Sequence, residues 1–61
     1  MSDFVNNLNA YVNQRVMIKL ENEELMRYQL DAVQDDCVTL SVENLKKIVP
    51  IHKIEYVQIS S

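Results

Sequence analysis

One stretch constrains the fold of this chain more than any other. Residues from Glu24 to Val42 predict a long strand, a sharp acidic turn and a returning strand. Apolar and polar residues alternate along both halves, and a period of two gives a strand one buried face and one wetter face. The alternation slips at Val33, where a second apolar residue follows Ala32. Such a slip predicts a bulge or strong bend, which lets a short sheet curl into a barrel.

The chain is short for a stable fold. Its 61 residues are expected to form one domain, residues 1–61, and a chain of this size buries only about 60% of its unfolded surface. Small domains usually rely on disulfides, a metal or a partner chain. Cys37 is the single cysteine, so no internal disulfide is possible, and one His with one Cys cannot build a structural zinc site. We therefore expect a homo-oligomer that holds no cofactor or metal.

The charge balance limits the classes of partner. The formal net charge is −3, from nine acidic and six basic residues, which argues against a protein-wide electrostatic attraction for nucleic acid. A net negative charge still allows a local basic patch on an assembled oligomer. We expect no signal peptide, and the sequence contains no apolar run of about 20 residues, so we also expect no membrane partner. The lone cysteine suits a reducing compartment and predicts a cytoplasmic location.

Periodicity gives the order of the elements. Apolar residues at helical spacing predict an amphipathic helix over about residues 3–12, capped by Ser2. Five strands follow, at about residues 15–20, 24–34, 37–42, 45–51 and 54–59, with one tight helical turn at 52–55 before the last strand. With no glycine in the chain, Asn22 and the Glu43-Asn44 pair are the expected turn residues. The predicted fold is mostly β: an N-terminal helix followed by a strongly bent, five-stranded antiparallel sheet that forms a small open barrel.

Several residues carry a resemblance to a known family. The apolar positions Val16, Ile18, Leu20, Met26 and Leu30, together with Asn22, match its pattern without a gap, and residues 49–54 (VPIHKI) match its second motif. In this layout the chain resembles the Sm-like superfamily, including its bacterial Hfq-type branch. The resemblance implies an SH3-like, Sm-like barrel. It also implies a closed ring of about five to seven subunits, joined by edge-strand pairing, and RNA binding or RNA chaperoning.

The resemblance also indicates where RNA would bind, and where this chain departs from the pattern. Gln34, Asp36 and Val38 stand where the family has an aspartate, a stacking ring and a uracil-reading asparagine. Tyr28 replaces a glycine, and His52 falls on the signature histidine. Stacking needs a π-face, which Asp36 lacks, so binding is expected to be backbone-directed, salt-sensitive and weakly sequence-specific. The candidate nucleic-acid-binding residues are His52, Lys53, Asp36, Gln34 and Tyr28.

Each candidate has a simpler interpretation. His52 can be a polar turn residue and Lys53 a solvated lysine. Lys46 and Lys47 are better explained as edge-strand lysines that discourage aggregation than as phosphate contacts. The Asp35-Asp36 pair more often forms a turn than a metal site. Tyrosines in strands are more often part of a core or interface than a stacking platform.

Three functional hypotheses remain at this stage. The first is an RNA-associated Sm-like ring, and the second is a homo-oligomeric scaffold that keeps the barrel, has lost the uridine pocket and binds protein. The third is a monomeric SH3-like barrel. We expect no enzyme, because one His, one Cys and no glycine cannot supply a nucleophile, its base and a nucleophile elbow.

Overall fold

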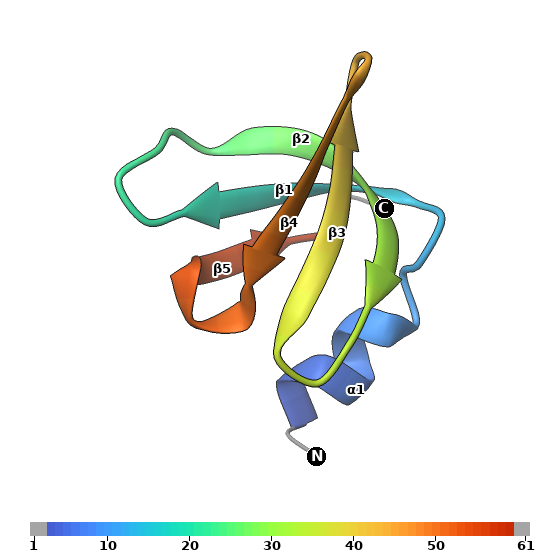
Figure 1. Cartoon of the computed structure of the whole chain (residues 1–61). Coiled ribbons are helices and arrows are strands. Elements are labelled where there is room, and N and C mark those ends of the chain that lie inside the picture. Colours follow the sequence, from blue (N-terminus) through green and yellow to red (C-terminus); the bar gives the residue numbers. More distant parts are fainter. Residues whose placement is uncertain (1–2, 60–61) are drawn as a thin grey trace.

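The computed structural model describes residues 3–59 and contains one short helix followed by a five-stranded antiparallel sheet that is not closed (Figure 1). Its elements are α1 (Asp3–Asn9), β1 (Arg15–Leu20), β2 (Met26–Val33), β3 (Cys37–Val42), β4 (Leu45–Pro50), the 3-10 helix η1 (Ile51–Lys53) and β5 (Ile54–Gln58). The strand order is β4-β3-β2-β1-β5, so β4 and β5 form the two edges. The mostly β, open barrel-like fold predicted from the sequence is confirmed. The predicted cap at Ser2 lies outside the described residues.

The helix is shorter than predicted, because it ends at Asn9 instead of near residue 12. Beyond it, the N–H groups of Ala10, Tyr11 and Val12 each donate to a carbonyl three residues back. This pattern tightens the chain into successive turns. Asn13 then takes a left-handed φ of 72°, a conformation that asparagine tolerates and that ends helices.

Smaller differences affect three strands and the tight turn. The last strand ends at Gln58, one residue before the predicted end. The second strand begins at Met26, later than predicted, after the turn in which Asn22 has a φ of 63°. The fourth ends at Pro50, which has no N–H for a continuing ladder. The tight helical turn covers Ile51–Lys53 instead of residues 52–55.

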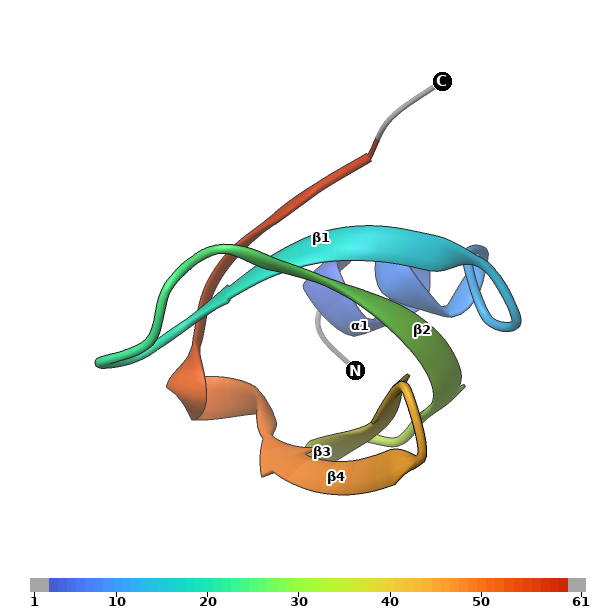
Figure 2. The same cartoon turned by 90° about the horizontal axis from the view of Figure 1, so that it is seen from above.

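The bend in β2 comes from one extra residue. Leu30 pairs with Leu40, but the next pair joins Ala32 to Thr39, so Asp31 has no partner across β3. The predicted slip therefore exists, but it lies at Asp31 and not at Val33. A bulge of this kind increases the local twist and bends its strand. Figure 2 shows the result, with β2 curving from the layer of β1 to the layer of β3 and β4.

The concave face of this sheet holds the core. The residues with the largest fully buried side chains are Tyr28, Ile18, Leu30, Leu40 and Val38. Leu8 joins the same cluster from α1, which closes one end of the barrel (Figure 1). Met26 was predicted to face inward, but it is 40% exposed. The reason is that β3 pairs with β2 only from Gln29 onward and leaves Met26 uncovered.

No helix in the described part of the chain is long and apolar enough to cross a lipid bilayer.

A matched pair of substitutions tests the position of the core. Ile18 is 0% exposed and Ile48 is 74% exposed. Ile18→Val should lower the free energy of unfolding by about 0.5–1.5 kcal/mol, because it removes one buried methyl group. Ile48→Val should change it by less than about 0.5 kcal/mol. Urea unfolding at a concentration where the chain is a monomer measures both, and equal losses would contradict the assigned core.

Candidate functional site

Four of the five predicted site residues lie near one end of the barrel. Gln34 and Asp36 belong to the turn between β2 and β3, and His52 and Lys53 belong to η1. The N–H of Ile51 donates to the carbonyl oxygen of Asp36 at 2.9 Å, which fixes η1 against this turn. All four side chains are exposed. The structure therefore brings together the turn and the His-Lys pair.

Acidic groups accompany the two basic residues at this end of the barrel. The Lys53 ammonium lies 3.7 Å from the Glu21 carboxylate, and the Glu21 N–H donates to the Lys53 carbonyl oxygen at 2.8 Å. Asp35 and Asp36 are both exposed in the neighbouring turn. The Glu21 carboxylate offsets the attraction of Lys53 for phosphate, and the exposed turn adds negative charge at the same end of the barrel.

The fifth predicted residue, Tyr28, occupies a different environment. Its side chain is 1% exposed and forms part of the core, so its ring is closed to a stacking base. The Lys47 ammonium lies 5.5 Å from the ring centroid, within the range of a cation–π contact. Lys47 also donates to Glu23 at 3.3 Å, and this hydrogen bond is the main reason that the pKa of Lys47 lies above its ordinary value. The Lys47 side chain thus covers the core beside Tyr28.

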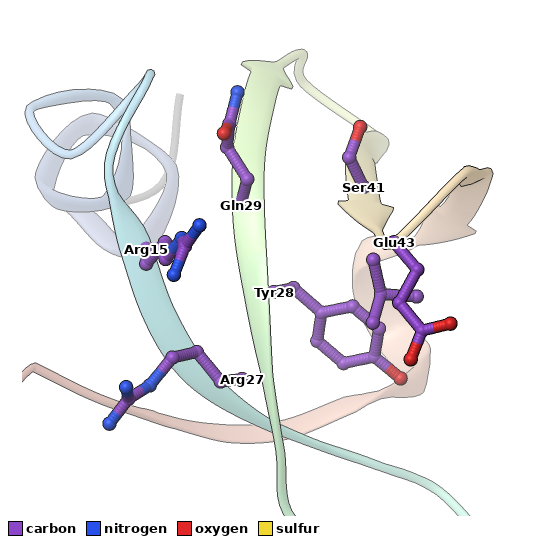
Figure 3. A pocket seen from close by; sticks show the side chains of 7 residues that line it. Arg15, Arg27, Tyr28, Gln29, Ser41 and Glu43 are labelled. Atoms are coloured by element: carbon purple, nitrogen blue, oxygen red, sulfur yellow. The ribbon is translucent and has the colours of Figure 1, made fainter.

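A separate hollow lies across β1, β2 and the end of β3. It has a volume of about 360 Å³, and Figure 3 shows the side chains around it. The lining residues are Arg15, Arg27, Tyr28, Gln29, Ser41, Val42 and Glu43. Two arginines and three other polar side chains make it more polar than the groove beside α1 that Phe4, Leu8 and Val57 help to line.

The strand register explains why the two arginines share this hollow. Arg15 pairs directly with Gln29, and Met17 pairs with Arg27. Arg15 and Arg27 are therefore diagonal neighbours on the outer face of two paired strands, with Cβ atoms roughly 7 Å apart. In Figure 3, Arg15 extends from β1 toward β2, whereas Arg27 reaches from β2 across β1.

These arginines differ from the lysines in their partners. The chain has six lysine and arginine side chains. Among the described residues, four different lysines form the four ion pairs. Within residues 3–59, Arg15 and Arg27 form no ion pair and no hydrogen bond through their side chains, and both are exposed. The uncompensated positive charge of lysine and arginine is thus concentrated at one place.

The acidic groups near the hollow are partly compensated. Asp31, the bulge residue, accepts hydrogen bonds from Ser41, from Gln29 at 3.0 Å and from Lys46 at 3.2 Å. The Ser41 hydrogen bond is the largest cause that holds the pKa of Asp31 below its ordinary value, and Lys46 acts in the same direction. Glu43 lies on the other side of β2 from both guanidinium groups in Figure 3.

Metal binding and thiol reactivity at the acidic turn depend on its carboxylates and on Cys37. Among residues 3–59, no three His, Cys, Asp or Glu side chains come together in a group that could hold a metal ion. Burial raises the pKa of the Cys37 thiol, and the neighbouring Asp36 raises it further. A raised pKa lowers the fraction of thiolate, which is the reactive form.

Sequence reasoning missed Arg15 and Arg27, although a usable signal was present. A hairpin centred on Asn22 places Arg15 opposite Gln29, and alternation places Arg27 on the same outer face. Combining turn position with strand phase would have identified the pair. What the sequence did not reveal is that the lysines, and not the arginines, are the side chains with acidic partners.

Comparisons with family models, curated proteins and solved structures found no match to this chain.

The Asp31 cluster has a testable pH dependence. The pKa of Asp31 in the folded chain lies below 3.8, its ordinary value. A lowered pKa stabilises the fold above the unfolded value, and this stabilisation is lost as the pH falls through the folded value. Ser41→Ala removes the largest cause, so stability should fall less steeply in the variant between about pH 6 and about pH 3. Urea unfolding across this range measures it.

Thr39→Ala is the control for this experiment, because Thr39 lies on the same strand and its hydroxyl does not bond to Asp31. Its pH dependence should match that of the parent chain. A Ser41→Ala variant with the parent's full pH dependence would contradict the assigned role of the hydrogen bond.

Proposed function

We propose that this chain is a divergent Sm-like module that assembles with copies of itself into a closed ring and serves as a homo-oligomeric scaffold. One observation carries the proposal: the sheet has two open edges, β4 and β5, and both carry exposed apolar side chains. An open edge presents unpaired backbone N–H and C=O groups that another strand can satisfy. Pairing β4 of one copy with β5 of the next is head-to-tail, and it forms a ring where the rotation closes.

The side chains on the two edges suit each other. On β4, Leu45 is 66% exposed and Ile48 is 74% exposed. On β5, Tyr56 is 44% exposed, and Ile59, just after the strand, is 45% exposed. Exposed apolar residues concentrated on strand edges are typical of interfaces. A second copy of the chain covers both sets at once.

Shape adds to this match. A groove of about 160 Å³ lies between α1 and the end of β5, and it is lined by Phe4, Asn7, Leu8, Tyr11, Val57 and Ile59. This mainly apolar groove continues the β5 edge and offers space for an apolar side chain from the neighbouring β4.

The energies are consistent with a ring more than with an isolated dimer. Burying one large aliphatic side chain contributes about 1.5–3 kcal/mol. Association costs about 4–15 kcal/mol in lost translational and rotational freedom, so one small edge contact gives weak binding. Closing a ring adds an interface without bringing in another subunit, because the final contact is intramolecular.

Two substitutions of an exposed apolar residue by lysine, one on β4 and one elsewhere, test the β4 edge. Ile48→Lys adds a charge to the proposed interface and should reduce the assembly to single chains. Met26→Lys also replaces an exposed apolar residue, 40% exposed, but on the inner strand β2, and should leave the mass unchanged. Light scattering measures both masses. An Ile48→Lys variant that keeps the parent's mass would contradict pairing through β4.

RNA association is a second candidate, favoured by the two unpaired arginines on the outer face. The buried position of Tyr28 and the acidic turn argue against base stacking at the expected pocket. Contacts to the RNA backbone need no stacking ring and depend on cationic side chains. A cytoplasmic location belongs to the same proposal, since a single free thiol suits a reducing compartment.

Titration with short labelled RNA tests this candidate. U-rich and A-rich oligomers should bind the assembled protein with similar affinity at low salt, because backbone contacts carry no sequence information. The affinity should fall steadily as salt is added, because bound phosphates release counterions. Absence of binding at the lowest salt would remove RNA association and leave the scaffold proposal untouched.

A further inference from the structure

We propose that the hollow bordered by Arg15 and Arg27 binds two phosphates of a single-stranded RNA backbone on the outer face of β1 and β2. This inference rests on the RNA association proposed above, and it names a site away from the η1 end of the barrel. The sequence pointed to His52 and Lys53 in η1. The charges of the folded chain point instead to the two arginines.

In the described part of the chain, the two arginines lack the acidic partner that the lysine of η1 has. In η1, the Lys53 ammonium lies 3.7 Å from the Glu21 carboxylate. Arg15 and Arg27 have no carboxylate partner among residues 3–59, and the Asp31 carboxylate, which is hydrogen-bonded to Gln29 and Ser41 of the hollow, also pairs with Lys46 at 3.2 Å. An incoming phosphate therefore displaces no ion pair at the arginines.

The spacing of the two arginines suits two phosphate groups. Guanidinium groups are planar forks whose N–H donors match two phosphate oxygens. Diagonal neighbours on paired strands hold two such forks roughly 7 Å apart at their Cβ atoms. Both side chains are long, so the two guanidinium groups can each contact one of two successive phosphates of an extended RNA strand. Gln29, which lies opposite Arg15, has a second amide N–H beyond the one it donates to Asp31.

The described residues give the hollow neither an apolar centre nor an accessible aromatic ring. Protein interfaces have an apolar centre, but Gln29, Ser41 and Glu43 line this hollow beside the arginines. The only aromatic ring there, Tyr28, is 1% exposed. A polar hollow with two cations and no accessible ring fits a phosphate backbone, with little preference among bases.

Glu43 sets a limit on affinity. It lines the same hollow, is exposed and carries a charge that repels phosphate. Removing this charge by Glu43→Gln should tighten RNA binding about two- to threefold, since like charges near a bound anion weaken it. Tighter RNA binding by this variant, beside weaker binding by the arginine variants, would show that the charge at the hollow controls the affinity.

The experiment is a titration of labelled ten-nucleotide oligo-U with the full chain and its variants. Arg15→Gln and Arg27→Gln should each weaken binding several-fold, and the double variant more than tenfold. Each should also lower the slope of log affinity against log salt by about 0.7, the value for one phosphate on a single strand. Arg27→Lys should keep the slope and lose part of the affinity, because it keeps the charge and loses the fork.

Control variants separate the possible failures. Lys19→Gln removes one charge from a lysine of β1 that does not line the hollow and pairs with Glu55, and it should change the affinity less than twofold. If combined His52→Ala and Lys53→Ala abolish binding while the arginine variants do not, the inferred site is wrong and RNA association stands. If the parent chain binds no RNA, both fall. Displacement of oligo-U by poly-glutamate at equal charge concentration would overturn the choice of phosphate over an acidic peptide.

Discussion

The bulge at Asp31 is the constraint on which the rest of the structure depends. The strand β2 pairs with β1 along its first half and with β3 along its second half. It can do so only because one unpaired residue bends it between the two layers. The side chain of that residue accepts hydrogen bonds from Gln29 on β2, Ser41 on β3 and Lys46 on β4. The same residue therefore creates the bend and ties the bent strand to its neighbours.

The bend determines which surfaces remain available. A sheet that curls without closing leaves β4 and β5 as open edges, with exposed apolar side chains on both. It also turns Arg15 and Arg27 outward onto the convex face while the opposite face packs the core. The edges and the convex face do not compete for the same residues. The proposed assembly through the edges would therefore leave the arginines open to solvent, repeated once in each subunit.

Charge pairing refines what the composition suggested. A net charge of −3 argues against nucleic-acid binding by the protein as a whole. In the folded chain, however, the acidic residues compensate the lysines: Glu55 pairs with Lys19, Glu23 with Lys47 and Glu21 with Lys53. Exposed pairs of this kind contribute little to stability. Their more important consequence is that they leave the two arginines as a local positive site.

Much of the fold could be predicted from the sequence, because it depends on local patterns. Alternation in residues 37–42 fixed the inward side chains Val38 and Leu40, and Asn22 marked its turn correctly. The exact bulge position was not predictable, since the apolar pair Ala32-Val33 suggested a later slip. The exposure of Met26 depends on where β3 stops pairing, which is a tertiary property. The candidate site was harder, because ion pairs such as Lys53–Glu21 join residues far apart in the chain.

The central claim is that the two open edges pair between copies of this chain. Its most direct test is the mass of the unmodified protein in solution, measured by light scattering over a hundredfold dilution. Edge pairing into a closed ring predicts one species of about five to seven times the 7.1 kDa of a single chain. It also predicts that this species persists until dilution separates it cooperatively into monomers. A mass of one chain at every concentration would contradict edge pairing and leave a monomeric barrel.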